Sequence, residues 1–146
     1  MVSEVYRKIL VATDGSIHTE KAVRYAVELA RLAEARILAL HVVDTTAFAG
    51  IPMDVTWESM YELLLIEGSN ATKRVVEIAS DAGVEVEEKM LEGHPAEEIM
   101  QIGEEVSADL IVMGSIGKSG LDRFLLGSVA DKVARNSKIP VMVVRN

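Results

Sequence analysis

The sequence predicts an α/β fold: a doubly wound, five-stranded parallel sheet of order 3-2-1-4-5, with helices on both faces. Three observations lead to this prediction. Short strand-like segments alternate with segments of helical periodicity, which is typical of parallel sheets covered by right-handed crossovers. The first, second and fourth strand-like segments are continuously apolar and favour central positions, whereas the third alternates and favours an edge. The length of 146 residues fits one domain, so we expect a single domain over residues 1–146.

The N-terminal third begins with a strand and a helix that meet at a cluster of turn formers. An apolar run at residues 9–12 predicts the first strand, which stops at the sequence Thr-Asp-Gly-Ser of residues 13–16. A helix over about residues 19–35 follows, because apolar residues recur there at a spacing of three or four. Residues 37–43 indicate a second apolar strand, and residues 45–56 indicate a loop longer than the usual connection.

The middle of the chain predicts a long helix and an edge strand. The helix spans residues 57–82, with Gly68 and Ser69 as its weakest point and Gly83 as its C-terminal cap. Apolar and charged residues then alternate over residues 84–90, which indicates a strand with one solvated face.

The C-terminal third completes the alternation. Pro95 suits the first turn of a third helix, and residues 109–113 indicate another buried strand. A last helix over residues 129–136 is expected to take Ser128 as its N-cap. Residues 140–144 predict the fifth strand.

Composition excludes several classes of function. Fifteen Lys and Arg against 23 Asp and Glu give a net charge of −8, which argues against binding to a nucleic-acid backbone. The chain has no cysteine, so disulfides, thiolate metal sites and thiol catalysis are excluded. Its three histidines show no metal-ligand spacing. No apolar run approaches the roughly 20 residues of a membrane span, and we expect a cytoplasmic protein that does not bind membranes.

The predicted strand order puts the topological switch point between the first and fourth strands, where ligands of such folds bind. Asp14 follows the first of these strands, and a glycine-rich stretch from Gly114 follows the other. Glycine lets backbone N–H groups approach an anion closely, and Lys118 and Arg123 are the cations of this stretch. It matches neither the P-loop nor the dinucleotide fingerprint. The stretch therefore predicts a phosphate site, with a glycine-containing surface turn as the alternative.

The spacing Gly114-x2-Gly117-x9-Gly127-Ser128 resembles the ATP-binding motif G-2x-G-9x-G-(S/T) of the universal stress protein family. The similarity extends over nearly the whole chain, including the first strand with its Asp-Gly-Ser turn, the Leu-His-Val-Val run at residues 40–43 and the Ile-Pro-Val run at residues 139–141. This resemblance implies the adenine-nucleotide α-hydrolase-like fold and the ATP-binding branch of the family. Residues 1–146 would then form one nucleotide-binding domain.

The resemblance also implies a set of site residues. Asp14 would contact the ribose or the Mg²⁺ that arrives with ATP, with a plain turn residue as the alternative. Lys118 is a further candidate for the phosphates. The other implied residues line the adenine and ribose pocket or wrap the phosphates: Ala12, Thr13, Val42, Met113, Gly114, Gly117, Gly127, Ser128 and Val129. No residue is assigned a catalytic role, and His41 is interpreted as a hydrogen-bonded core histidine.

The last strand suggests a partner. It is apolar and lies at a sheet edge in the predicted order, and such an edge is prone to pairing unless it is covered. Antiparallel pairing with a second copy across a two-fold axis would cover it, as is common in the family. We therefore expect a homodimer formed through Val141, Met142, Val143 and Val144.

Three functions remain open at this point. The first is an ATP-binding stress-response protein that uses the nucleotide as a ligand or as a switch of slow turnover. The second is a weak ATPase or phosphotransferase in which Lys118 or Arg123 stabilises the transferred charge. The third is a nucleotide-free dimeric interaction module, against which the intact glycine motif counts.

Overall fold

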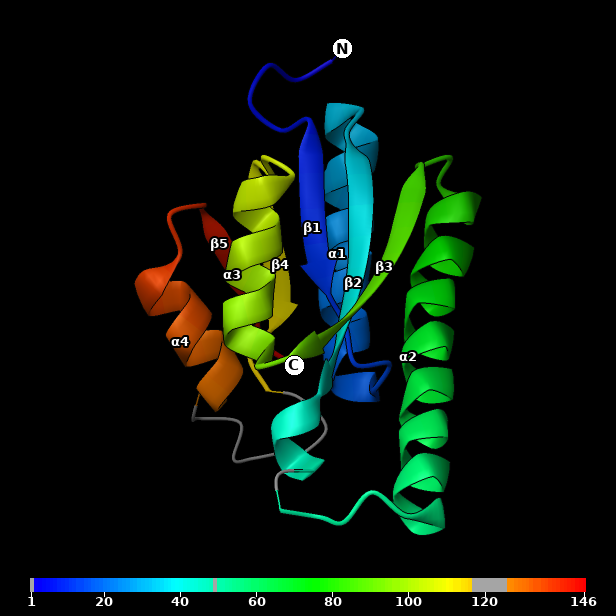
Figure 1. Ribbon diagram of the computed structural model, residues 1–146. Coiled ribbons are helices and arrows are strands. Elements are labelled where there is room, and N and C mark those ends of the chain that lie inside the picture. The colour runs from blue at the N-terminus through cyan, green and yellow to red at the C-terminus, as the bar shows by residue number, and fades with distance from the viewer. Residues whose placement is uncertain (1, 49, 117–125) are drawn as a thin grey trace.

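The computed structural model describes residues 2–48, 50–116 and 126–146 (Figure 1). Strands and helices alternate along the chain as the hydrophobic periodicity predicts. The elements are β1 (Lys8–Ala12), α1 (Ile17–Ala33), β2 (Arg36–Asp44), the 3₁₀ helix η1 (Thr45–Phe48), α2 (Val55–Asp81), β3 (Val86–Gly93), α3 (Pro95–Glu105), β4 (Leu110–Gly114), α4 (Ser128–Asn136) and β5 (Val141–Val144).

The strands form one parallel sheet in the order β3-β2-β1-β4-β5, which confirms the predicted fold. β1 lies between β2 and β4, so Val11 is paired with Ala39 on one side and with Val112 on the other. β1 and β4 are buried through their centres, as their continuous apolar sequences require. β3, with its alternating sequence, lies at an edge.

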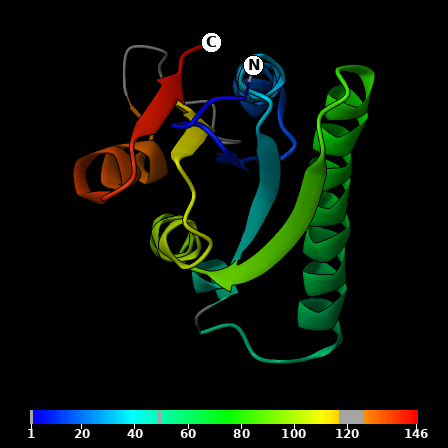
Figure 2. The same ribbon diagram turned by 90° about the horizontal axis from the view of Figure 1, so that it is seen from above.

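Helices cover the sheet in two layers, seen from above in Figure 2. Successive side chains of a strand point to opposite faces. Ile9 and Val11 of β1 therefore pack with α1 and α2, whereas Leu10 packs with α3 and α4 on the other face. β1 and β4 are neighbours in the sheet and lead into separate loops at their carboxyl ends. The predicted ligand site lies at these ends.

Two details at helix ends differ from the expectations or refine them. Ser128 is not the N-cap of α4, as expected, but its first residue; the N-cap is Gly127, with φ −62° and ψ 155°. The reason is a backbone contact from outside the helix: the Gly127 N–H donates to the Ser115 carbonyl at 2.7 Å, which holds residue 127 extended. At the other end of α2, Gly83 has a φ of +72° just beyond the helix, the position that favours glycine.

Helix α2 runs through Gly68 and Ser69 without a break. Gly68 is buried, and a Cβ atom there would lie 2.6 Å from Cδ2 of His41 and 2.6 Å from Sδ of Met90. The missing side chain therefore lets α2 approach β2 and β3 closely. In the described part of the chain, no helix has both the length and the apolar character needed to cross a bilayer.

Candidate functional site

A cavity of about 350 Å³ opens at the carboxyl ends of β1, β2 and β4, on the side covered by α3 and α4. Its size falls within the usual range for small-molecule sites. The lining comes from three strand ends, the first turns of α3 and α4, and the segments around the glycine-rich stretch: Ala12, Thr13, Asp14, Thr19, Leu40, His41, Val42, Asp44, Pro95, Ile99, Met113, Gly114, Ser115, Ile116, Gly127, Ser128, Val129 and Ala130.

The structure brings together every sequence-predicted site residue that it describes. Those of β1, β2 and β4 and those at the start of α4 all line this one cavity. Gly117 and Lys118, and with them Arg123, lie outside the described residues. The segments that meet here are separated by up to about a hundred residues of sequence, and the parallel sheet joins them because all its strands end on the same side.

The turn after β1 forms one polar wall. Oδ1 of Asp14 accepts hydrogen bonds from the Ser16 N–H at 2.9 Å and from the Thr19 hydroxyl at 3.1 Å. The Thr13 hydroxyl accepts from the Gly15 N–H at 3.1 Å and lies 3.2 Å from the Thr19 hydroxyl. Asp14 is thus the turn residue of the alternative interpretation and at the same time belongs to the cavity lining.

His41 is a residue of the lining that sequence reasoning assigned to the core. It is only 7% exposed, and its Nδ1 lies 2.8 Å from the Thr13 carbonyl oxygen, so the interpretation as a hydrogen-bonded core histidine is confirmed. This contact joins β2 to the turn after β1 at the floor of the cavity. Its position next to Val42 in the second strand was the available signal for a place in the lining.

Two glycines of the motif are needed by the local backbone. A Cβ atom on Gly114 would lie 3.1 Å from the His18 carbonyl oxygen, and one on Gly127 would lie 3.0 Å from the Ser115 carbonyl oxygen. Backbone atoms cannot move aside as a flexible side chain can. A side chain at either end of the glycine-rich stretch would therefore crowd the neighbouring backbone, and both glycines line the cavity.

The two ends of the cavity differ in chemistry. Val42, Met113 and Ile99 supply apolar surface that suits a planar base. At the other end, α4 begins at Ser128 with its N-terminal N–H groups beside the cavity. The N-terminus of a helix carries partial positive charge and unpaired donors, which suit phosphate groups. Within residues 2–48, 50–116 and 126–146, no group of three or more His, Asp or Glu side chains is placed so that it could hold a metal ion.

Several lining residues were not predicted. Pro95 and Ile99 belong to α3, which packs on β2, β3 and α4, and no local pattern indicates which face of that helix meets a cavity. Asp44 gave a clearer signal, because it is the last residue of β2 and strand ends on this side are expected to face the ligand.

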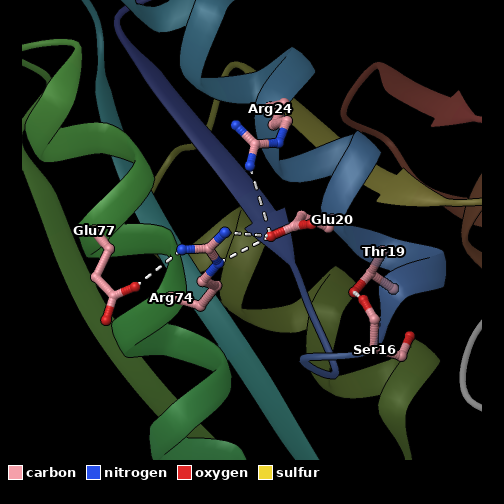
Figure 3. Close-up of polar contacts among 6 residues, drawn as sticks. All are labelled: Ser16, Thr19, Glu20, Arg24, Arg74 and Glu77. Atoms are coloured by element: carbon pink, nitrogen blue, oxygen red, sulfur yellow. Dashed lines mark hydrogen bonds and ion pairs between the residues drawn. The ribbon is translucent and has the colours of Figure 1, made fainter.

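Next to the cavity, an ion-pair network ties the start of α1 to α2 (Figure 3). Arg74 of α2 lies 2.8 Å from Glu20 of α1 and 3.0 Å from Glu77, and the Thr19 hydroxyl lies 3.1 Å from the Ser16 carbonyl oxygen. The hydrogen bond that Arg74 donates to Glu20 is the main cause that raises the pKa of Arg74. Exposed ion pairs contribute little to stability, so this network adds little to the free energy of unfolding.

Comparison with known proteins gives consistent results. Residues 5–145 match the model of the universal stress protein family. Universal stress protein MJ0531 of Methanocaldococcus jannaschii is 45% identical over 141 residues, which are 97% of this chain and 83% of that protein. The solved structure of MJ0577 from the same organism superposes with a TM-score of 0.84 at 32% identity, covering 97% of both chains.

Two further solved structures contain adenine nucleotides. A universal stress protein from Archaeoglobus fulgidus in complex with dAMP has a TM-score of 0.72 and 28% identity, covering 97% of this chain and 99% of that one. A universal stress protein in complex with cAMP has a TM-score of 0.70 and 29% identity, covering 97% and 98%.

Proposed function

Because the chain belongs to the universal stress protein family, we propose that it binds ATP in the cavity at the ends of β1, β2 and β4. ATP would act there as a bound ligand or as a switch of slow turnover in a stress response, and residues 1–146 would form one nucleotide-binding domain. The observation that carries this proposal is the cavity itself. It lies at the topological switch point of the sheet, and its lining combines apolar side chains with the N-terminus of α4.

The lining supports an orientation for the nucleotide. The base would lie against Ala12, Val42 and Met113, and the ribose near Thr13 and Asp14. The phosphates would lie at the start of α4, near Gly114 and Gly127 and the hydroxyl of Ser128, with Val129 beside them. The dAMP and cAMP complexes of the two similar proteins support an adenine nucleotide as the ligand class.

The residues present also fit a magnesium ion that arrives with ATP. Mg²⁺ is usually held by one or two carboxylates together with phosphate oxygens and water. Asp14 supplies a carboxylate at the cavity wall, oriented by its hydrogen bonds to Ser16 and Thr19. We propose that this carboxylate faces the metal or the ribose.

The first test is to denature freshly purified protein and analyse the supernatant by chromatography for adenine nucleotide. Titration calorimetry with ATP and MgCl₂ then measures the affinity of nucleotide-free protein. Finding no released nucleotide and no binding of added ATP would refute the proposal. Phosphate release in the same samples tests for turnover; turnover above trace level that is lost in Lys118→Ala would favour the phosphotransferase alternative.

A substitution at Ser128 localises the site. Ser128→Glu puts a carboxylate where the phosphates would bind, while a negative charge in the first turn is favourable for the helix itself. We expect the Kd for ATP to rise at least tenfold, or about 1.4 kcal/mol. Ser128→Gln is the matched control, equal in size but uncharged, and is expected to change Kd much less. Equal effects of the two substitutions would place the phosphates elsewhere.

We also propose a homodimer through β5. This strand is at the sheet edge, and Met142 is 36% exposed while Val144 is 6% exposed. Antiparallel pairing of two copies would cover the open edge and the exposed side chain of Met142. Sedimentation velocity is expected to give a dimer for the unmodified chain and a monomer for Met142→Lys. A monomer in both cases would refute this part of the proposal.

A further inference from the structure

Within the described part of the chain, the first half of α2 leaves its outer side exposed. All of the buried residues of α2 lie in its second half: Gly68, Ala71, Thr72, Val75 and Ala79. Residues 55–67 extend past the carboxyl ends of the strands, where the sheet no longer supports them (Figure 1). On the inner side of this half, Trp57 packs on Phe48 of η1 with ring centroids 5.5 Å apart, and within α2 it stacks on Tyr61 at 5.2 Å.

The outer side of this half carries large apolar side chains. Val55 is 77% exposed, Leu63 is 61% exposed and Ile66 is 56% exposed. At about 100° per residue, these three positions fall within an arc of about 80°, roughly opposite the buried face of the second half. We call Val55, Leu63 and Ile66 the outer stripe. It runs for about 16 Å, or three helical turns.

Carboxylates border the outer stripe. Residues 51–72 contain Asp54, Glu58, Glu62 and Glu67 and neither lysine nor arginine. On the helical projection Glu58 and Glu62 lie on one flank of the stripe and Glu67 on the other. Glu58 and Glu62 are both exposed. The surface is therefore an apolar strip with acidic margins.

These charges discriminate among possible occupants. Two copies of the chain meeting through the outer stripe would bring acidic margins face to face in either orientation, which is unfavourable. An anionic lipid surface is repelled in the same way. The proposed dimer also leaves the stripe uncovered, because α2 packs on β2 and β3 at the opposite end of the sheet from β5.

We propose that the outer stripe docks a basic amphipathic helix of a partner protein. Apolar side chains of that helix would lie along Val55, Leu63 and Ile66, and lysine or arginine residues beside them would meet Glu58 and Glu62. This is the helix-in-groove type of recognition, in which apolar anchors give affinity and charged margins give orientation and specificity. The contact of Trp57 with Phe48 of η1 ties the receiving helix to the domain beforehand, so little ordering of this chain is needed on binding.

The test uses a synthetic 18-residue peptide of leucine and lysine, with leucine on one helical face and a fluorophore at its N-terminus, and follows the fluorescence anisotropy of that peptide as the protein is added. A peptide of the same composition in shuffled order is the ligand control. We expect saturable binding of the amphipathic peptide only, and a Kd at least tenfold higher for Leu63→Gln/Ile66→Gln. Leu32→Gln, on α1 and also 61% exposed in the native chain, is the matched variant and should change Kd less than twofold.

The charged margin is tested separately. Glu58→Gln/Glu62→Gln is expected to raise Kd severalfold in low salt and to flatten its dependence on salt. Glu87→Gln, an exposed glutamate of β3, is the control. ATP binding is measured on every variant and should be unchanged, which separates this proposal from that of the nucleotide site.

Three results would overturn the proposal. The first is equal binding of the amphipathic and shuffled peptides, or equal Kd values for the Leu63/Ile66 and Leu32 variants. The second is a change of oligomeric state in Leu63→Gln/Ile66→Gln by sedimentation, which would assign the stripe to a second copy. The third is binding to phosphatidylcholine vesicles that is lost in the same variant, which would assign it to a lipid surface.

Discussion

Replacing Gly68 by alanine tests the packing between α2 and the site. The new Cβ would lie 2.6 Å from Cδ2 of His41 and 2.6 Å from Sδ of Met90, and at such distances an atom must move. Met90 is 38% exposed, so its flexible thioether can turn outward. His41 is 7% exposed and holds the Thr13 carbonyl at 2.8 Å, so its ring can move only by distorting that hydrogen bond.

Two effects of opposite sign set the size of the change. Alanine is better than glycine in a helix by about 1 kcal/mol. Overpacking a filled space costs about 1–3 kcal/mol. The balance predicts that Gly68→Ala lowers the free energy of unfolding by about 1 kcal/mol. Gly103→Ala in α3 is the matched control: its Cβ would lie 3.1 Å from the terminal methyl group of Ile139 and 3.3 Å from that of the buried Ile111. These milder contacts are expected to offset the helix preference of alanine, so this variant should be close to neutral.

Urea denaturation followed by circular dichroism measures both variants, with an unchanged m-value as the condition for comparing midpoints. The His41 ring holds the Thr13 carbonyl, and Thr13 lines the cavity, so Gly68→Ala should also weaken ATP binding, whereas Gly103→Ala should not. The reasoning would be refuted if Gly68→Ala were about 1 kcal/mol more stable than the unmodified chain, since the helix preference would then act without a packing cost.

Helix caps and one surface carboxylate give further predictions. Asp54 caps α2 by accepting a hydrogen bond from the Trp57 N–H at 3.0 Å. Asp54→Ala should therefore lower the free energy of unfolding by about 1 kcal/mol, measured by thermal denaturation. The buried Ser16 hydroxyl at the start of α1 has no hydrogen-bond partner among the described residues, so Ser16→Ala should cost nothing measurable; a loss equal to that of Asp54→Ala would contradict this. The hydrogen bond from Lys132 lowers the pKa of Glu97. The stability that this pair adds is present above the ordinary carboxyl pKa and is lost as pH falls through the lowered pKa of Glu97. In an NMR titration Lys132→Met should raise that pKa, and an unchanged titration would show that the pair does not form.

Much of the fold could be predicted because it follows from local pattern. The apolar runs of β1, β2 and β4 and the alternation of β3 were enough to order the sheet, with strand and helix ends displaced by at most three residues. The prediction of Ser128 as the N-cap of α4 was wrong. The deciding contact, from the Gly127 N–H to the Ser115 carbonyl, joins residues twelve apart across the glycine-rich stretch, so the residues next to Ser128 in the sequence do not reveal it.

The residues of the site also fall into those that local pattern predicts and those that it does not. Asp14, Gly114 and Ser128 could be named in advance, because they follow strands or begin a helix on the side of the sheet where ligands bind. Ile99 and His41 could not be assigned to the lining, because their place in the cavity depends on how α3 and β2 lie against other elements.

The sequence by itself determined the elements, the sheet order and the family resemblance, since each depends on hydrophobic periods of two to four residues or on the spacing of glycines along the chain. Tertiary structure alone decided where those elements come together. It explains why residue 68 is glycine, because close packing of α2 on β2 leaves no space for a Cβ atom beside His41. It also left the outer stripe uncovered, because α2 is longer than the sheet on which its second half packs. Periodicity shows which face of a helix is apolar, but only the neighbours that pack against the helix decide which apolar residues stay exposed.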